Sequence, residues 1–599
     1  MSGPRVCGPS AAAHPARNGR GGGTASRREE ATVTGGVGGP EPSRTGLVPW
    51  PPEAVARYVA AGYWEGRPLG ACIMAVADAV PDAEALVSGN VRLTYRELVE
   101  WADGLALRLH ALGLRRDDRI VVQLDNRWEF VVLTLACLRL GVLPVMALPA
   151  HRHHEMSHLV RQAEARAVVV PAETDRFDHQ EMARRIAAGQ PGLSHVLAAG
   201  ARPAPGSVDL RALCRPAEDP AAARRQLDAA APNSRDVALF LLSGGTTGLP
   251  KLIARTHDDY AYNARRSGEV SGFGPSTVYL AALPLAHNFP LACPGILGTL
   301  LVGGRVVVAP SPSPKKVFDL IERERVTVTA AVPTIAQSWL AFQESGPGYD
   351  LGTLRVLQVG GARLADEVAW RVRPTLGCQL QQVFGMAEGL LNYTRLDDPD
   401  EVVCHTQGRP ICPDDEILVV DEEGRTVPDG IPGLLLTRGP YTLRGYYRAE
   451  GQNRIAFTAD GWYRTGDVVR RRPDGNLVVE GRDKDMINRA GEKISAEEVE
   501  NFAYQVPGID LAAAVAMPDP EFGERVCLYA VIRAGAPVQL SGVQAVMERA
   551  GVARFKRPER LVEVAALPRT NVGKVDKKAL REDIRRRLAA ETPDDVPPT

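Results

Sequence analysis

The most chemically suggestive stretch of the sequence is a loop rich in glycine and hydroxyl side chains. It follows the apolar run at 237–242 and contains Ser243, Gly244, Gly245, Thr246, Thr247, Gly248 and Lys251. Glycines let backbone N–H groups converge on an anion, hydroxyls add donors, and a lysine adds a point charge. The spacing is not that of a Walker A loop, because only two residues separate Gly248 from Lys251 and no Ser or Thr follows. Taken alone, the loop indicates either a phosphate-binding site or a flexible turn.

Lysine is rare in this chain, which makes its positions informative. Only nine of the 71 basic residues are Lys. A lysine that is kept in an arginine-rich chain indicates a site that needs a compact ammonium rather than a guanidinium fork. Four of the nine, Lys251, Lys484, Lys493 and Lys574, lie in short motifs.

Five further motifs follow in order toward the C-terminus. They are Gln382–Glu388 (QVFGMAE), Tyr463–Asp467 (YRTGD), Gly481–Asp485 (GRDKD), Asn488–Lys493 (NRAGEK) and Asn571–Lys574 (NVGK). Together with the 243–251 loop, they resemble the adenylate-forming superfamily of acyl-CoA synthetases, luciferases and nonribosomal adenylation domains. The resemblance covers residues 47–588 and implies a ligase that uses ATP and Mg²⁺.

The resemblance also implies a role for each motif. Phe384 would flank the adenine, Glu388 would hold Mg²⁺, and Asp467 would bind the ribose hydroxyls. Arg482 would lie near the ribose, and Lys574 would be the adenylation lysine. Other implied ATP or AMP contacts are Gly360, Gly361, Ala362, Val383, Gly385, Met386, Ala387 and Val479, and Ala387 stands where many members have Thr.

A second half-reaction is implied by the same family. Lys484 would be the hinge pivot about which a small C-terminal domain alternates. Gly491 and Lys493 would line the channel for a phosphopantetheine arm. Since no carrier-type attachment motif follows the small domain, we expect a separate aryl carrier protein to supply that thiol, with coenzyme A as the alternative acceptor.

Charge governs the expected first step. An aryl carboxylate must attack an α-phosphorus that is surrounded by negative oxygens, so positioning and charge neutralisation dominate and no covalent nucleophile is needed. Lys574 would bridge the carboxylate and phosphate oxygens. Lys251 and Mg²⁺ on Glu388 would stabilise the departing pyrophosphate.

Within the superfamily the chain resembles the stand-alone aryl-acid ligases of siderophore biosynthesis. The strings that carry this resemblance lie at 287–291 (HNFPL), 244–260 and 381–395. Amino-acid-activating domains have an Asp where Asn288 stands, whereas a neutral amide suits an ortho-hydroxyl group. The expected aryl pocket consists of His287, Asn288, Phe289, Cys293, Gly361, Val383 and Leu391.

Two of these residues favour salicylate over 2,3-dihydroxybenzoate. Ligases for the dihydroxy acid tend to carry Ser and Val where this chain has Cys293 and Leu391, and Cys is a weak hydrogen-bond partner while Leu is bulkier. Burying a 3-hydroxyl group unpaired costs roughly 1–3 kcal/mol. We expect salicylate, with 2,3-dihydroxybenzoate and 3-hydroxypicolinate as alternatives.

The elements that must position these residues are predicted from periodicity. Short β-rich runs alternate with amphipathic helical segments at about 47–198, and alternation resumes with the run at 237–242, so two α/β sheets are expected. Hairpin signals at 415–481 predict a small β-subdomain. The fold class is α/β, with a large domain at 47–483, a loop excursion at 199–235 and a small mobile α+β domain at 484–588. Residues 1–46 are expected to be a disordered tail and 589–599 a frayed one.

Composition excludes several protein classes. Lys+Arg is 71 and Asp+Glu is 72, giving a net charge of −1, which argues against a nucleic-acid or anionic-membrane binder. Nine Cys without a C-x-x-C pair form no disulfide framework, and we expect reduced thiols in a cytoplasmic protein. The most apolar stretch, at 130–150, is interrupted by Arg139, Gly141 and Pro144, so no membrane span is expected.

Overall fold

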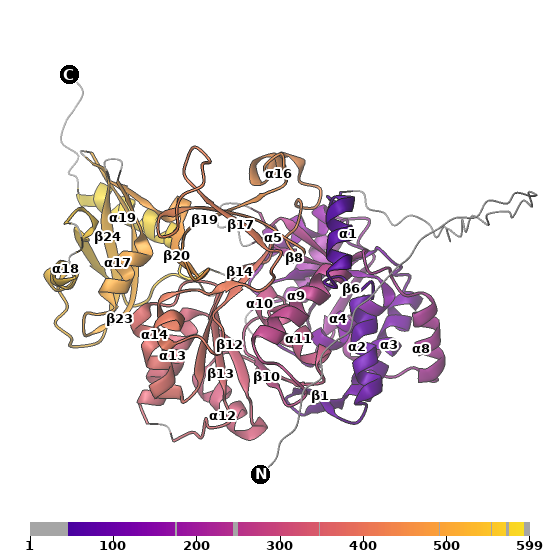
Figure 1. Cartoon of the computed structure of the whole chain (residues 1–599). Coiled ribbons are helices and arrows are strands. Elements are labelled where there is room, and N and C mark those ends of the chain that lie inside the picture. The colour runs from indigo at the N-terminus through magenta and orange to yellow at the C-terminus, as the bar shows by residue number, and fades with distance from the viewer. Residues whose placement is uncertain are drawn as a thin grey trace, which may run out of the picture. The chain divides into compact units, whose positions relative to one another are not determined.

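The computed structural model describes residues 46–173, 177–243, 249–346, 348–489, 492–520, 522–550, 552, 554–570 and 574–591. The tail expected at 1–46 lies outside the described residues apart from Gly46. The described chain has the α/β class that the alternation predicts, with a large N-terminal part and a small C-terminal domain (Figure 1).

A seven-stranded sheet carries the glycine-rich loop. Its order is β7(Val208–Asp209), β6(His195–Ala199), β5(Ala167–Pro171), β3(Arg119–Gln123), β4(Leu143–Ala147), β8(Val237–Leu242) and β9(Leu252–Thr256). Neighbouring strands run parallel except β8 and β9, which pair antiparallel on either side of the loop. Strands β4 and β5 are apolar and buried throughout, as expected for a parallel sheet that is covered on both faces.

A nine-stranded sheet carries the adenine motif. Its order is β16(Arg409–Pro410), β15(Gly389–Tyr393), β14(Gln379–Met386), β13(Val356–Gly360), β12(Val328–Ala331), β10(Val278–Ala281), β11(Arg305–Val308), β1(Glu84–Ser88) and β2(Val91–Thr94). Its central strands are parallel, and β14 turns back antiparallel into β15. The carboxyl ends of β13 and β14 therefore bring the implied contact residues Gly360, Gly361 and Ala362 and the Gln382–Glu388 motif to one edge of the sheet.

Two strands lie in a different sheet from the one that their order in the sequence suggests. Strand β8, expected in the second sheet, pairs with β4 of the first through Val145 and Phe240. Strand β1, which comes early in the chain, pairs with β11 of the second sheet. Hydrophobic alternation predicts that a strand exists but not which strand it pairs with. The assignment of the run at 237–242 to the second sheet is therefore wrong.

Residues 199–235, expected as a loop excursion, contain regular structure. Strand β7 extends the sheet edge, and α7(Leu210–Leu213) and α8(Pro220–Ala229) follow it. Asp219 caps α8 by accepting a hydrogen bond from the Ala222 N–H at 2.9 Å, and Pro220 occupies the first turn. Both residues favour a helix start, which explains why this Ala- and Arg-rich segment is helical.

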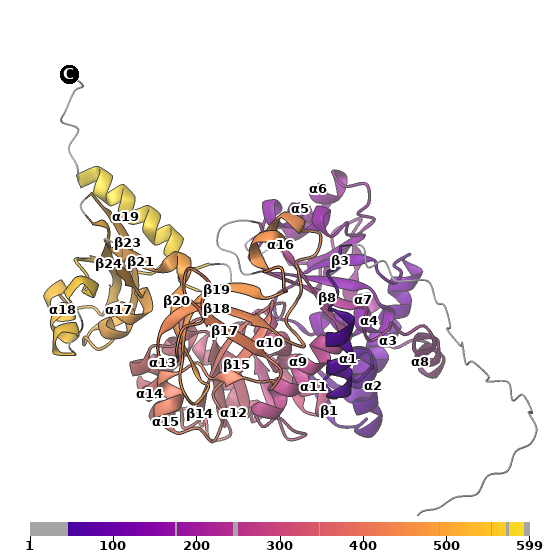
Figure 2. The ribbon, with the colours of Figure 1, turned by 45° about the horizontal axis from the view of Figure 1, so that its top comes forward.

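The β-subdomain expected at 415–481 is an antiparallel sheet. Its order is β17(Glu416–Val420), β18(Pro432–Arg438), β19(Tyr463–Arg471) and β20(Leu477–Arg482). Strand β20 leads into the short helix η1(Asp483–Asp485), which contains the expected hinge residue Lys484. Figure 2 shows these strands beside the elements of the small domain.

The small domain has a sheet with a separate core on each face. Its strands are β22(Glu492–Ile494), β21(Ile487–Arg489), β24(Gly523–Ile532) and β23(Ile509–Asp519), with β25(Arg560–Glu563) beside β24, and its helices are α17(Ala496–Ala503), α18(Leu540–Arg549), η2(Arg554–Lys556) and α19(Lys577–Glu591). Along β23, Ala512 and Ala514 join one core while Ala513 and Val515 join the other, the period-two pattern of a strand. Since α19 runs to Glu591, the tail expected at 589–599 begins within a helix.

The remaining helices belong to the large domain. They are α1(Pro52–Ala60), α2(Leu69–Ala79), α3(Tyr95–Ala111), α4(Trp128–Leu140), α5(His153–Gln162), α6(His179–Ala188), α9(His257–Val270), α10(Asn288–Ala292), α11(Gly295–Leu301), α12(Pro314–Glu324), α13(Pro333–Glu344), α14(Asp366–Leu376), α15(Asp400–His405) and α16(Glu450–Ala456). Within the described ranges, none of the helices combines the length and apolar character that crossing a bilayer requires.

Candidate active site

A cavity of about 620 Å³ lies where the nine-stranded sheet, the β-subdomain and the small domain meet. Many residues singled out in the sequence line it: Ser243, Lys251, Gly361, Ala362, Val383, Phe384, Gly385, Met386, Glu388, Asp467, Val479, Arg482 and Lys574. Motifs that lie hundreds of residues apart in the sequence therefore meet at one cavity.

The two ends of the glycine-rich loop are tied together. The Ser243 N–H donates to the Lys251 carbonyl at 3.0 Å, and the Lys251 N–H donates to Ser243 Oγ at 3.0 Å. These bonds extend the β8–β9 ladder and bring Lys251 to the cavity. Its Nζ lies 5.3 Å from the ring centroid of Tyr446. Gly244 to Gly248 lie outside the described residues, so the backbone anion site stays a prediction.

Glu388 lies in a tight turn between β14 and β15. The next residue, Gly389, has φ +153°, and a Cβ there would meet the Thr442 Cα at 2.4 Å, so only glycine fits. The Leu443 N–H donates to the Glu388 carbonyl at 2.8 Å, and the Tyr446 hydroxyl donates to Glu388 Oε1 at 2.9 Å. These contacts fix the turn that carries the Glu388 carboxylate at the cavity.

Asp467 and Arg482 are paired across β19 and β20. Arg482 Nε lies 2.6 Å from Asp467 Oδ1, and Arg482 NH1 donates to the Thr465 carbonyl at 3.2 Å. Burial raises the pKa of the Asp467 carboxyl, while the charges of Arg482 and Lys574 oppose the rise. Asp467 Oδ2 is buried without a hydrogen-bond partner among the described residues. A buried acceptor without a donor fits a ligand that brings hydroxyl groups.

Lys574 reaches the cavity from the small domain. Its carbonyl accepts a hydrogen bond from the Thr570 N–H at 2.7 Å, which holds the turn before α19. Its Cε lies 3.5 Å from the place that a Cβ on Gly361 would take, and Gly361 has φ +84°. Burial, and after it the charge of Lys574, lowers the pKa of His287 to about 4. The Lys574 side chain thus lies against the β13–α14 loop.

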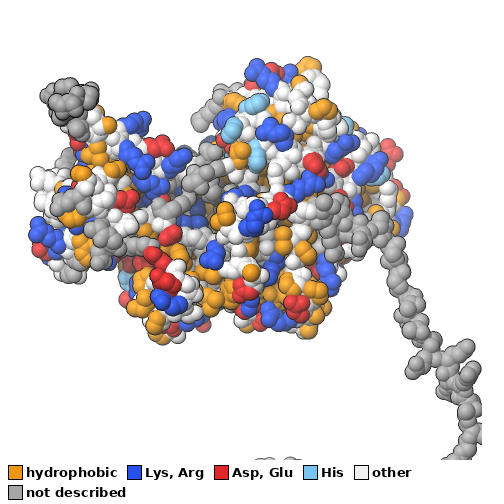
Figure 3. Space-filling view, turned by 90° about the horizontal axis from the view of Figure 1, so that it is seen from above, with side chains coloured by type: hydrophobic (Ala, Val, Ile, Leu, Met, Phe, Trp, Pro, Cys, Tyr) orange, Lys and Arg blue, Asp and Glu red, His pale blue; other side chains and the backbone are white. Residues whose placement is uncertain are grey.

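The small domain adds a charged cluster that the sequence analysis missed. Lys577 Nζ lies 2.8 Å from Glu500 Oε1 and 3.3 Å from Glu497 Oε1. Burial raises the pKa of Glu500 to about 7, although Lys577 opposes the rise. The sequence does contain one signal for this cluster, because the i, i+3 spacing of Glu497 and Glu500 puts both carboxylates on one face of a helix. Figure 3 shows Lys and Arg side chains where the small domain borders a hollow.

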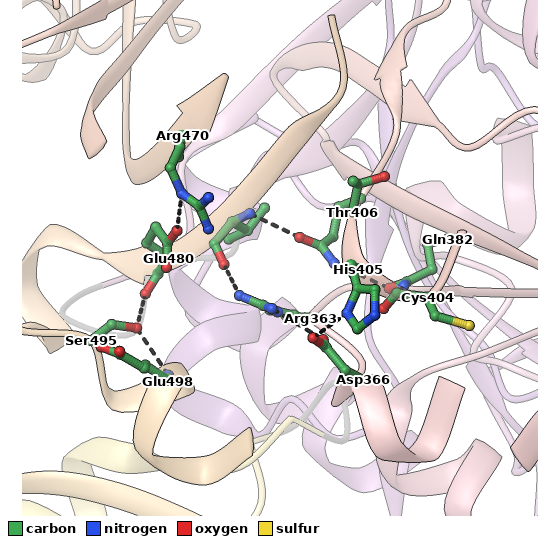
Figure 4. A network of polar contacts seen from close by, with 12 residues as sticks. Arg363, Asp366, Gln382, Cys404, His405, Thr406, Arg470, Glu480, Ser495 and Glu498 are labelled. Atoms are coloured by element: carbon green, nitrogen blue, oxygen red, sulfur yellow. Dashed lines mark hydrogen bonds and ion pairs between the residues drawn. The ribbon is translucent and has the colours of Figure 1, made fainter. Parts of the chain in front are cut away.

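A polar network holds the cavity wall formed by β20 (Figure 4). Arg363 NH1 donates to the Val479 carbonyl at 3.0 Å, and Gln407 Oε1 accepts from the Val479 N–H at 2.8 Å. Arg363 also pairs with Asp366 at 3.1 Å, and His405 Nδ1 lies 2.7 Å from the same carboxylate. Both backbone polar atoms of Val479 are therefore held, which keeps β20 beside the β13–α14 loop.

Several predicted aryl-pocket residues lie in the layer behind the cavity wall. A Cβ on Gly360 would lie 3.2 Å from Phe289 Cε1 and 3.1 Å from Val383 Cβ. A Cβ on Gly385 would lie 2.3 Å from Leu391 Cδ2. The two glycines therefore let the Phe289 ring and the Leu391 side chain pack directly against the backbone of the cavity wall.

Asn288 and Cys293 lie at the two ends of α10 and are only 6% and 2% exposed. Asn288 Oδ1 accepts a hydrogen bond from the Tyr260 hydroxyl at 2.8 Å, and Asn263 Nδ2 lies 3.8 Å from Cys293 Sγ. Burial raises the pKa of the Cys293 thiol to about 12, so the thiol is neutral near pH 7.

Not every predicted residue lies on the cavity surface. Within the described chain, that surface does not include Gly360, Ala387 or the predicted aryl-pocket residues His287, Asn288, Phe289, Cys293 and Leu391. The Ala387 carbonyl instead accepts a hydrogen bond from Arg255 NH1 at 3.1 Å. Gly491 and the side chains of Lys484 and Lys493 lie outside the described residues, so their roles stay predictions.

A buried carboxyl below Leu391 was also missed. The Leu391 N–H donates to the Tyr441 hydroxyl at 3.2 Å, and that hydroxyl donates to Asp415 Oδ2 at 2.5 Å. Burial raises the pKa of Asp415 to about 8. This chain of hydrogen bonds ties β15 to the turn before the β-subdomain.

Three relatives match almost the whole described chain. A salicylyl-CoA synthase/salicylate adenylyltransferase from a Streptomyces species is 60% identical over 543 residues, covering 91% of this chain and 98% of the relative. A 2-hydroxy-7-methoxy-5-methyl-1-naphthoate–CoA ligase from Streptomyces carzinostaticus is 59% identical, with 90% and 97% covered. A salicyl-AMP ligase/salicyl-S-ArCP synthetase from Mycobacterium tuberculosis is 48% identical, with 90% and 95% covered.

A solved structure and two family models agree with these relatives. The apo structure of MbtA from Mycobacterium smegmatis is 45% identical, has a TM-score of 0.68 and covers 90% of this chain and 98% of its own. The model of the AMP-binding enzyme matches residues 74–447, and that of the AMP-binding enzyme C-terminal domain matches 498–574. The predicted superfamily is confirmed: the chain belongs to the AMP-binding enzymes, and is a ligase whose relatives activate aryl acids.

Proposed function

We propose that this protein activates salicylate with ATP, forming salicyl-adenylate and pyrophosphate. The observation that carries the proposal is the convergence of Lys574, Glu388 and the Asp467–Arg482 pair on one cavity. Lys574 would supply a positive charge for the acid carboxylate, and Glu388 a carboxylate for the metal of the nucleotide. Asp467 would supply a buried acceptor for the ribose hydroxyls.

The nucleotide would be held by groups of complementary polarity. Asp467 Oδ2 would accept hydrogen bonds from the ribose hydroxyls, and the β14 backbone around Phe384 would border the adenine. Lys251 would contact the outer phosphates. Since no described cluster of three or more His, Cys, Asp or Glu could hold a metal alone, Mg²⁺ would bind Glu388 together with phosphate oxygens, as is common for this ion. When bound, it neutralises phosphate charge.

Lys574 would act where charge moves during the reaction. Its position near Gly361 supports contact with both the acid carboxylate and the α-phosphate. In a partly buried cavity such a fixed charge stabilises the transition state far better than a mobile ion in water does. No side chain needs to form a covalent bond.

Neutral groups favour an ortho-hydroxy acid. Asn288 carries no charge that could pair with an amino acid's ammonium group, and the Cys293 thiol is neutral. Leu391 fills the space beside Gly385, which leaves less room for a second hydroxyl. 2,3-Dihydroxybenzoate and 3-hydroxypicolinate are the alternatives that the same residues would accept less well.

The second half-reaction would pass the salicyl group to a thiol. The first candidate acceptor is the phosphopantetheine of a separate aryl carrier protein in a siderophore or related pathway, in line with the printed name of the Mycobacterium tuberculosis relative. The second is coenzyme A, which the names of the two Streptomyces relatives favour.

The test is ATP–pyrophosphate exchange with salicylate, 2,3-dihydroxybenzoate, 3-hydroxypicolinate, benzoate and a 2-hydroxy-1-naphthoate. We expect salicylate to give the highest kcat/KM, by tenfold or more, which corresponds to about 1.4 kcal/mol. Mass spectrometry of an aryl carrier protein and of coenzyme A after incubation with ATP and salicylate then identifies the acceptor. Exchange with none of the aryl acids would refute the proposal.

A further inference from the structure

The segment Arg255–Tyr260 (RTHDDY) lies behind the predicted aryl pocket, where Tyr260 contacts Asn288. It spans the end of β9 and the start of α9. Asp259 Oδ2 accepts from the Thr256 N–H at 2.6 Å and from Thr256 Oγ1 at 2.8 Å, and Asp259 Oδ1 lies 2.7 Å from Arg255 Nε. Such a capping box with a buried ion pair fixes the start of α9 rigidly.

Tyr260 extends from this fixed start to the amide of Asn288. Its side chain is fully buried, the guanidinium of Arg255 lies 4.8 Å from its ring centroid, and its hydroxyl donates to Asn288 Oδ1 at 2.8 Å. One turn later Asn263 Nδ2 donates to the Ala292 carbonyl at 2.7 Å, at the far end of α10. Helix α9 thus holds both ends of α10.

The Tyr260 hydrogen bond determines what Asn288 can offer to a ligand. A primary amide has an acceptor oxygen and a donor nitrogen of nearly the same shape, so without a partner it can turn over. Because Tyr260 donates to the oxygen, the NH₂ group is left as the part of the amide available for recognition. A donor suits an ortho oxygen on the aryl acid and does not suit an ortho amine.

We propose that Tyr260 is a specificity-determining positioning residue that sets the orientation of the Asn288 amide and so selects aryl acids with an ortho oxygen. The inference rests on the proposed function, because it needs an aryl acid beside Asn288. Tyr260 does not touch the acid; it acts through Asn288.

The principal test is Tyr260→Phe, which removes only the hydroxyl. We compare kcat/KM in ATP–pyrophosphate exchange for salicylate, anthranilate and benzoate. Since an unmade hydrogen bond in a buried site typically changes such ratios about tenfold, we expect the salicylate-to-benzoate ratio to fall by roughly tenfold, mainly through KM. The anthranilate-to-salicylate ratio should rise, and benzoate should be used as by the wild type.

The matched control is Tyr279→Phe. Tyr279 is another buried tyrosine, on β10, and its ring packs against Phe273 with centroids 6.2 Å apart. This variant loses the same hydroxyl group but should keep the wild-type ratios. A double-mutant cycle gives a second control: in an Asn288→Ala background, Tyr260→Phe should no longer change the salicylate-to-benzoate ratio.

Two outcomes separate failure of this inference from failure of the proposed function. If the wild type prefers salicylate and Tyr260→Phe lowers exchange with all three acids equally, or acts as strongly in the Asn288→Ala background, the inference alone is wrong. If the wild type uses no ortho-hydroxy acid, both are wrong. Should Tyr260→Phe not fold, the wild type still decides: anthranilate used as well as salicylate would overturn the inference.

Discussion

Replacing Lys574 by alanine should separate the two proposed half-reactions. The Lys574 Cε lies 3.5 Å from the place of a Gly361 Cβ, so the ammonium reaches whatever fills the cavity at that loop. A unit-charge pair about 4 Å apart is worth about 4 kcal/mol at an effective dielectric constant near 20. Removing one such contact usually costs about 3–4 kcal/mol, or 10²–10³ in rate. We expect ATP–pyrophosphate exchange with salicylate to fall by about that factor.

Two assays on the same protein make this prediction specific. The first is ATP–pyrophosphate exchange, and the second is formation of the salicyl thioester from chemically supplied salicyl-adenylate, which needs no ATP. Lys574→Ala should impair the first and leave the second near the wild-type rate. Lys315→Ala, which removes an equal charge from a side chain on α12 that is 70% exposed and outside the cavity lining, should affect neither. Equal loss in both assays would refute the assignment of Lys574 to adenylation.

Three further perturbations test other parts of the site. Cys293→Ser combined with Leu391→Val should move the preference toward 2,3-dihydroxybenzoate by roughly tenfold or more, and an unchanged kcat/KM ratio in exchange would contradict the pocket assignment. Asp467→Asn should raise the KM for ATP by roughly 10- to 100-fold, which is the usual effect of losing a hydrogen bond to a charged group. The KM for salicylate should not change, and a change confined to salicylate would exclude a ribose contact. Because burial raises the pKa of Asp415 to about 8 while an unfolded Asp titrates near pH 4, its contribution to stability is complete below about pH 4 and is lost as the pH rises through 8. Asp415→Asn should therefore flatten the fall in Tm between those pH values, whereas the control Asp414→Asn should not. If the Tm profiles of the wild type and Asp415→Asn run parallel, Asp415 does not cause the fall in Tm.

Sequence motifs located the cavity because each motif combines a backbone requirement with a reactive side chain. Glu388 is recognisable since Gly389 must follow it for the turn to form, and Lys574 since lysine is otherwise rare. By contrast, Arg363 and Gln407 act on the backbone of Val479, 116 and 72 residues away. A contact to a backbone atom leaves no complementary residue type in the sequence, so neither side chain could be singled out.

The pairing of strands was the other feature that the sequence could not provide. Strand β8 pairs with β4 through Phe240 and Val145, and both strands are apolar runs of similar length. Any parallel strand buried on both faces offers the same pattern. Asp415 illustrates the same limit for polar groups, because what distinguishes it from its neighbour Asp414 is the hydrogen bond from Tyr441, which lies 26 residues away in the sequence.

The contacts on either side of Lys484 indicate what the domain alternation implied by the family resemblance would have to break. Val479 is held on the large-domain side by Arg363 and Gln407, so such a movement would begin after it. From the small domain, Ser495 Oγ donates to the Glu480 carbonyl at 2.5 Å (Figure 4). That bond contributes only about 1 kcal/mol net, but Tyr504, at the end of α17, also packs against a core cluster of the large domain. These contacts oppose the domain alternation that the family resemblance implies, because Lys574 would leave the cavity only after they are broken.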